Sequence, residues 1–270
     1  MPFGWAPLML AAILGALIGT VLALTGAGGG ILAVPMLVMA LQLPMQQAAP
    51  TALLVVGLVS AVGAALGLRQ GIVRYRAALL IGCAGTLSAP LGSHVAGLLP
   101  QAWLLAGFAA LMLLLAWRQW RADPQAIARA DLPCVTQPWC GRLQWTSACA
   151  RALALTGAVS GFFSGLVGVG GGFVIVPSLA RYSNLPWDNI QATSLAVIAL
   201  VSASATAHAV WNGQIAWAVA LTFAGGALGS FLILRRPAQR LPRALSRRLF
   251  AMLVLLVAMV MLLKLGHVLA

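Results

Sequence analysis

A glycine-rich phrase occurs twice in this chain, each time within a long apolar stretch. The two copies, LTGAGGG at residues 24–30 and LVGVGGG at residues 166–172, are 142 residues apart, and each is followed by a proline, Pro35 or Pro177. Lipid cannot satisfy the backbone N–H and C=O groups that clustered glycines expose, so such segments occur only where protein, water or a solute does so. The phrase therefore predicts a duplicated chain with two interrupted membrane helices and a candidate binding site at the interruptions.

The composition is typical of a polytopic membrane protein. Of the 270 residues, 62% are hydrophobic and only 7% are charged, against roughly a quarter charged in ordinary soluble domains. Sixteen Lys and Arg against three Asp and Glu would suggest nucleic-acid binding in a soluble chain. In a membrane protein, basic loop residues instead set the orientation and lie against anionic lipid. We therefore expect an all-α, multi-pass protein in the lipid bilayer, with no nucleic-acid partner.

The apolar runs divide into two groups of five. This division predicts a first transmembrane repeat at 1–117, a cytoplasmic linker at 118–151 and a second transmembrane repeat at 152–270. The second and seventh runs are shorter than the ~20 residues that a spanning helix needs, so we expect each to be a half-helix completed by its glycine segment. The runs lie at 8–24, 31–41, 48–68, 77–98, 102–117, 152–167, 173–180, 190–210, 215–234 and 249–263.

The loop charges predict that the two repeats have opposite orientations. In the first repeat the loop at 69–76 is basic and the loop at 96–101 is uncharged, whereas in the second repeat 211–214 is uncharged and 235–248 carries six arginines. Because basic loops stay in the cytoplasm, equivalent points of the two repeats must be separated by an odd number of crossings. We therefore expect an inverted five-plus-five helix repeat, interrupted at the glycine-rich segments, with both chain ends in the periplasm.

Residues around the glycine breaks are the candidates for binding a solute. Each break frees N–H donors and lets the next short helix begin with its positive dipole end toward the site, which favours an anion. Pro35 and Pro177 are expected to reinforce the helix breaks. Small polar residues that open the third and eighth runs can add uncharged donors. The candidate substrate-binding residues are Gly28, Gly29, Gly30, Thr51, Gly170, Gly171, Gly172, Gln191, Thr193 and Ser194.

Structural alternatives exist for all of these residues. Glycines also allow close helix packing, and hydroxyl groups in helices commonly bond to their own helix or to a neighbouring one. Ser60, Ser202 and Ser204, which lie deeper in the third and eighth runs, are further candidate donors to the solute, with the same structural alternative.

The chain lacks the motifs of common enzyme classes. It contains no Ser-His-Asp order, no HExxH, no Walker sequence and no clustered metal ligands, so we expect no enzymatic activity, no cofactor and no metal. Cys134, Cys140 and Cys149 share the linker at spacings that match no zinc signature. We expect their thiols to be free.

The paired phrases, together with two polar segments, resemble the TauE/SafE sulfite exporter family, also called the 4-toluene sulfonate uptake permease family. The likeness is carried by both glycine phrases with Pro35 and Pro177, by Ala-Pro-Thr at 49–51 and by Gln-Ala-Thr-Ser at 191–194. The resemblance implies a secondary transporter in the bacterial cell inner membrane that moves sulfite, organosulfonates or related carboxylate anions by alternating access. The family includes importers and exporters, so the direction does not carry over.

Two rival functions remain open from the residues. One is a membrane-embedded thiol redox or assembly protein that uses the three linker cysteines. The other is a passive anion channel. The sequence also leaves a homodimer open as an alternative to a monomer.

Overall fold

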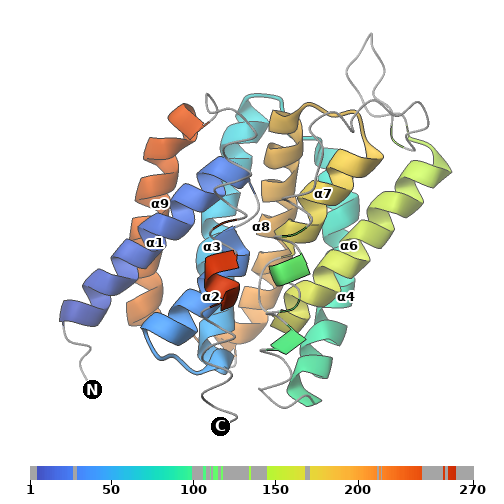
Figure 1. Cartoon of the computed structure of the whole chain (residues 1–270). Coiled ribbons are helices and arrows are strands. Elements are labelled where there is room, and N and C mark those ends of the chain that lie inside the picture. The colour runs from blue at the N-terminus through green and yellow to red at the C-terminus, as the bar shows by residue number, and fades with distance from the viewer. Residues whose placement is uncertain are drawn as a thin grey trace.

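A computed structural model provides the structure of the chain. It describes residues 5–26, 29–98, 106–107, 110, 112–114, 117, 134, 145–167, 171–211, 213, 215–238, 252 and 255–259. These residues form helices, with no strand in the described ranges, which confirms the predicted all-α fold (Figure 1). The helices are α1 Trp5–Thr25, α2 Gly29–Ala40, α3 Met45–Arg69, α4 Tyr75–Leu98, α6 Ser147–Val167, α7 Gly172–Tyr182, α8 Trp187–Trp211 and α9 Trp217–Ala238. The fifth and tenth apolar runs lie mostly outside the described residues.

Six of these helices are long and apolar enough to cross a bilayer: α1, α3, α4, α6, α8 and α9. The other two, α2 and α7, contain 12 and 11 residues. At 1.5 Å per residue they reach less than about 20 Å, short of the ~30 Å of hydrocarbon. Both continue past their prolines, Pro35 and Pro177. The helical structure is therefore interrupted at the glycines before each short helix, whereas the prolines lie inside the short helices.

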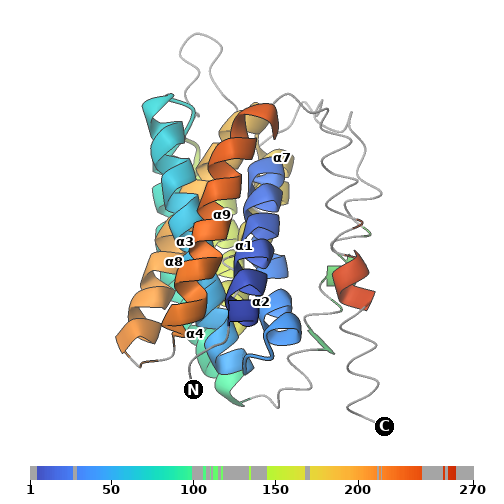
Figure 2. The ribbon, with the colours of Figure 1, turned by 90° about the vertical axis from the view of Figure 1, so that its left-hand side faces the viewer.

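Helices from the two predicted repeats pack against each other in matching pairs. The largest contacts join α4 to α6 and α1 to α9, and α3 meets α8 at the centre of the bundle. Figures 1 and 2 show α1 and α9 side by side along their lengths. Each of these pairs takes one helix from either side of the linker. The expected second repeat begins slightly early, because α6 starts at Ser147, within the last five residues of the range assigned to the linker.

Glycines bring the outer pairs into backbone contact. A side chain at Gly15 or Gly19 of α1 would meet the carbonyls of Phe223 or Ala227 on α9. Likewise, side chains at Gly157 and Gly161 of α6 would meet backbone atoms of α4. Interfaces of small residues are typical of membrane helices, where close packing replaces the hydrophobic effect. The packing role that the sequence left open thus applies to these glycines, which lie outside the two phrases.

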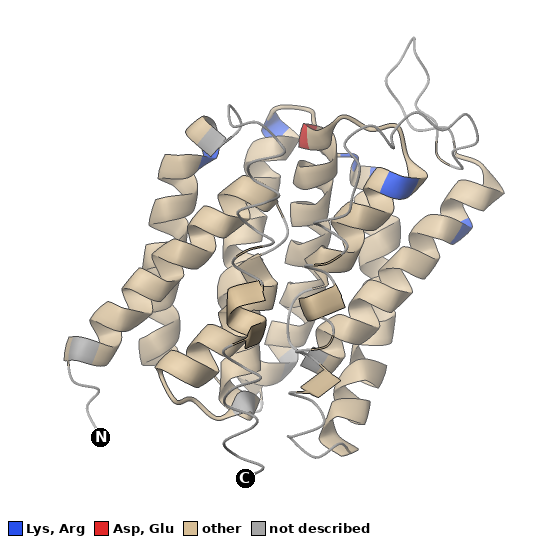
Figure 3. Cartoon of the chain, viewed as in Figure 1, with Lys and Arg blue, Asp and Glu red and all other residues tan. Residues whose placement is uncertain are grey.

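The charged side chains mark one end of the bundle. Figure 3 shows the basic residues of the described helices gathered at the end where α8 begins with Asp188. Helices α1, α3 and α9 run toward this end, while α4, α6 and α8 begin there. Thus α1 and α6, the first helices of the two predicted repeats, run in opposite directions. By the positive-inside rule, the arginine end is the expected cytoplasmic face.

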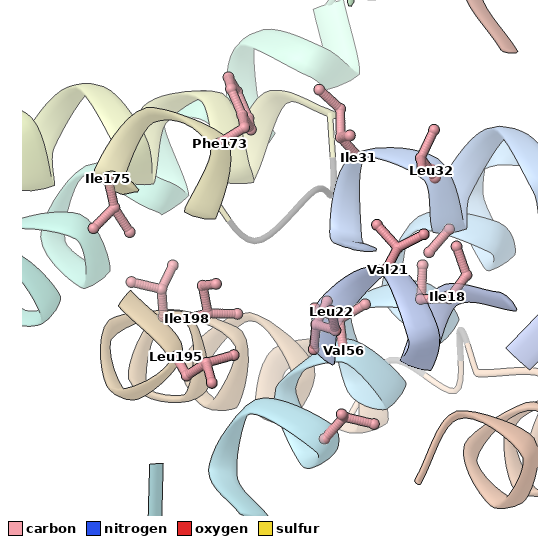
Figure 4. Packing of buried hydrophobic residues seen from close by; sticks show 14 of the residues in the cluster. Ile18, Val21, Leu22, Ile31, Leu32, Val56, Phe173, Ile175, Leu195 and Ile198 are labelled. Atoms are coloured by element: carbon pink, nitrogen blue, oxygen red, sulfur yellow. The ribbon is translucent and has the colours of Figure 1, made fainter. Parts of the chain in front are cut away.

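A continuous apolar core fills the centre. It combines Ile18, Leu22 and Val56 from the first group of helices with Ile175 and Ile198 from the second (Figure 4). Each of these five side chains is at most 2% exposed. The polar backbone groups at the glycine breaks therefore lie in an otherwise apolar core, where unpaired hydrogen-bond donors and acceptors are costly.

Candidate functional site

The first glycine break is held by a helix from the other repeat. Gly26, with φ +71°, ends α1 in a left-handed conformation, so the last carbonyls of α1 have no helical partner. Two carbonyls at this end of α1 accept from α8: Gln191 Nε2 donates to Leu24 O at 3.1 Å, and the Ser194 hydroxyl proton is shared between Gly26 O at 2.9 Å and Gln191 O of its own helix at 2.8 Å. The structure therefore brings together three parts of the predicted site, namely the first phrase, Gln191 and Ser194.

Helix α2 begins directly after this break. Gly29 and Gly30 are buried in its first turn, so the positive end of α2 lies inside the protein. Gly28 is outside the described residues. The predicted arrangement of a short helix starting within the bundle is thus present at Gly29.

The second break is held from within its own repeat. Gly171, with φ +65°, precedes α7 and is buried. Its carbonyl accepts a hydrogen bond of 3.1 Å from Ser160 Oγ on α6. Gly172 begins α7, whereas Gly170 is outside the described residues. Ser160 was not among the predicted site residues, although a serine pair with Ser164, one helical turn apart on α6, was a signal that could have identified it.

The two breaks differ because their surroundings differ in sequence. The positions in α3 that correspond to Gln191 and Ser194 are Ala49 and Ala52, which offer no side-chain donor. The position in α1 that corresponds to Ser160 is Ile18. Each break therefore has hydroxyl or amide support, and in both cases the donors lie in helices after the linker, α8 for the first break and α6 for the second.

The two predicted threonines make equivalent bonds at another place. Thr193 Oγ1 accepts from the backbone N–H of Arg74 at 3.1 Å, and Thr51 Oγ1 accepts from the N–H of Ala216 at 3.3 Å. Arg74 and Ala216 each precede the first residue of a helix, α4 or α9. Both hydroxyl oxygens thus accept from an N–H at the start of a helix in the other predicted repeat. The threonine hydroxyls are therefore bonded at helix starts, and not to the carbonyls at the Gly26 break.

A small cavity adjoins the first break near the arginine end of the bundle. Its lining includes Gly26, Asp188, Gln191 and Arg235. The Arg235 guanidinium donates to Gln70 Oε1 at 3.3 Å. The cavity, of about 20 Å³, has room for roughly one water molecule. The structure is therefore closed around this break, and a cation, a carboxylate and an amide line the same space.

The linker cysteines correct the expectation of free thiols. Cys134 and Cys149 form a disulfide with Cα atoms 4.9 Å apart. The N–H of Cys134 also donates to Tyr182 O, at the end of α7, at 3.1 Å. The spacing of the cysteines could not reveal this pair, because it forms only when the chain before α6 returns to the bundle. Cys140 lies outside the described residues, and Cys83 is free and exposed.

Replacing Ser194 with alanine is expected to destabilise the protein by about 1–3 kcal/mol, because the buried carbonyl of Gly26 loses its donor. The measurement is the thermal unfolding midpoint of the purified protein in detergent. Ser204→Ala is the matched control on the same helix, since the bond that Ser204 Oγ makes to a described residue is to Val201 O of its own helix, at 2.9 Å. Equal midpoints for the two variants would contradict the role of Ser194 at the break.

Comparison with known proteins agrees with this architecture. Residues 11–261 match the family described as Sulfite exporter TauE/SafE. A "Probable membrane transporter protein" of Xylella fastidiosa (strain Temecula1) is 32% identical over 250 residues, covering 90% of each chain. "Probable membrane transporter protein YunE" of Bacillus subtilis (strain 168) is 27% identical over 225 residues, covering 80% of this chain and 82% of its own. No solved structure matches the chain. The protein is therefore a multi-pass membrane protein that belongs to the TauE/SafE sulfite exporter family of membrane transporters.

Proposed function

We propose that the protein is a secondary transporter that moves small anions, such as sulfite or organosulfonates, across the bacterial inner membrane by alternating access. The observation that carries this proposal is the first glycine break, where α1 ends at Gly26 and is bonded across the repeats to Gln191 and Ser194. Because these hydrogen bonds join the two predicted repeats, they must lengthen or break when the repeats move relative to each other, and the carbonyls at the end of α1 then become free.

The charge at the breaks supports an anion as the solute. Two short helices begin within the bundle, at Gly29 and Gly172, and each presents N–H groups and a positive dipole end. Arg235 adds a cation beside the first break. In the described membrane helices the acidic residue is Asp188, in the first turn of α8. Asp188 and Arg235 line the same cavity and their charges offset each other, so the positive dipole ends of α2 and α7 are what favours a negative solute.

The helix directions support alternation between two faces. Equivalent helices before and after the linker run in opposite directions, and the largest contacts join the two groups. Inverted repeats of this kind let one arrangement open to one side of the membrane and its mirror arrangement open to the other. The glycine interfaces of α1 with α9 and of α4 with α6 supply the close contacts on which such motion would take place.

Uptake into proteoliposomes tests the proposal. We expect the purified protein to accumulate labelled sulfite or a small sulfonate against its gradient when a pH or ion gradient is imposed, with sulfate and short carboxylates as competing solutes. Comparing a pH gradient with a sodium gradient identifies the coupling ion. Flux that only equilibrates the solute would indicate a passive channel, and no flux of any of these anions would refute anion transport.

The thiol alternative is tested in the same assay. Replacing Cys134, Cys140 and Cys149 together with serine removes the linker disulfide and the third thiol. We expect the transport rate per folded protein to be unchanged, because the glycine breaks do not use these residues. A loss of activity that reducing agent reproduces in the wild type would favour the thiol redox or assembly role.

A further inference from the structure

Two serines lie where the central helices cross. A side chain at Gly57 of α3 would meet Cβ of Ser202 on α8, so these two residues are in direct contact. Ser60 follows Gly57 by one turn of α3. Both serines lie near the middle of their 25-residue helices, Met45–Arg69 and Trp187–Trp211. Since these helices are long enough to cross the bilayer, the contact of Gly57 with Ser202 lies close to the membrane midplane.

The hydroxyl groups at this crossing have no hydrogen-bond partner. Ser60 and Ser202 are 0% and 1% exposed, and within the described residues neither Oγ atom reaches an acceptor or donor. Thr206, one turn beyond Ser202 on α8, has a buried and equally unpartnered Oγ1. Most buried side-chain polar atoms in proteins are paired. The unpaired hydroxyls of Ser60 and Ser202 are therefore a costly feature that alanine at these positions would avoid.

Other hydroxyls in the membrane helices donate hydrogen bonds to backbone carbonyls of their own helix. Ser204, two residues after Ser202, donates to Val201 O at 2.9 Å. Thr156 of α6 donates to Ala152 O at 2.7 Å. The hydroxyls at the crossing do not make such bonds, so they are free to bind another molecule when α3 and α8 separate.

The chemistry of the crossing favours an anion over a cation. Both helices are unbroken here, so their backbone carbonyls are engaged in helical hydrogen bonds, and the hydroxyl groups are the free polar atoms of the crossing. Coordinating a metal cation in this setting normally requires several carbonyl or carboxylate oxygens. Hydroxyls can instead donate hydrogen bonds to the oxygens of a small oxyanion without introducing a fixed charge into the membrane.

We propose that Ser60 and Ser202 form a second anion-binding position at the midplane, which the solute occupies after it leaves the first glycine break. The proposal rests on the anion transport proposed above. In the present structure the contact between Gly57 and Ser202 closes this position. It opens when α3 and α8 move apart, and the hydroxyls then donate to the oxygens of the passing sulfite or sulfonate.

The test compares the double variant Ser60→Ala/Ser202→Ala with Ser204→Ala in proteoliposome uptake of labelled sulfite. For the double variant we expect the KM for sulfite to rise at least about tenfold, as for the loss of hydrogen bonds to a charged group. Its unfolding midpoint should be unchanged or higher, because two unpaired hydroxyls are removed. Ser204→Ala should match the wild type.

The outcomes separate this proposal from the proposed function. A wild-type KM in the double variant, with a raised unfolding midpoint, would overturn the midplane position while leaving anion transport intact. A changed sodium requirement with an unchanged KM for sulfite would overturn it in favour of a cation site. If the wild type itself transports no anion, the proposed function fails and the midplane position fails with it.

Discussion

Replacing Gly171 with valine is expected to reduce anion transport at least about 100-fold. The residue has φ +65°, a conformation that is strongly disfavoured for a β-branched side chain. In addition, a Cβ atom there would meet both Oγ and the backbone carbonyl of Ser160. Because backbone atoms of a packed helix cannot give way, the start of α7 must move. The measurement is initial uptake per monodisperse protein in proteoliposomes.

Gly71→Val is the matched control for this variant. Gly71 has nearly the same φ, +69°, but nothing lies within 4 Å of the place where its Cβ would be. It therefore carries the backbone strain without the contact at the second break, and we expect it to keep most of its activity. Equal losses in the two variants would show that strain alone, rather than the geometry of the break, accounts for the effect.

Gly29→Val tests the first break, where the atom nearest to a new Cβ belongs to a flexible side chain. A Cβ at Gly29 would meet Cδ1 of Leu22 and approach Ile18 O. The leucine side chain can adopt another rotamer, whereas the carbonyl cannot. We therefore expect transport to fall here as well, but less than in Gly171→Val.

Replacing Gly226 with leucine is expected to prevent assembly of the folded protein. A side chain at Gly226 of α9 would meet the carbonyl of Ala12 on α1, and this contact lies in one of the two largest helix interfaces. Membrane helices of this kind depend on close packing of small residues, since lipid supplies no hydrophobic drive for their association. The expected result is loss of the monodisperse peak on size exclusion in mild detergent.

The neighbouring Gly225 provides an internal control. It is exposed on α9, and nothing lies within 4 Å of the place where its Cβ would be. Gly225→Leu should therefore yield folded, active protein. A folded Gly226→Leu variant with wild-type transport would refute the packing of α1 against α9.

The helices themselves follow closely from the sequence. The run predicted at 190–210 corresponds to α8, Trp187–Trp211, and the short run at 173–180 corresponds to α7, Gly172–Tyr182. Hydrocarbon forces this agreement, because a long apolar segment can satisfy its backbone in lipid only as a helix. The small shifts at helix ends arise where polar and aromatic residues extend a helix beyond its apolar run.

The candidate site followed from the sequence only in part. Gln191 and Ser194 were predicted, and the structure brings them to Gly26. Ser160 was missed, because its acceptor, Gly171 O, lies just before the next helix and no short motif connects the two. The state of the linker cysteines was predicted wrongly, because a disulfide depends on where the linker returns to the bundle.

The sequence by itself determined that the chain is a helical membrane protein. It also determined the two places at which the helical structure is interrupted, and which loops carry the positive charge. These properties depend on local composition, because lipid acts on each segment separately. Only the tertiary structure decided that the first break is bonded by the other repeat, and that Ser60 and Ser202 stay unpaired while Ser204 does not. The reason is that a hydroxyl in a helix can bond to its own carbonyls or to a neighbour, and the crossing of the helices selects between them.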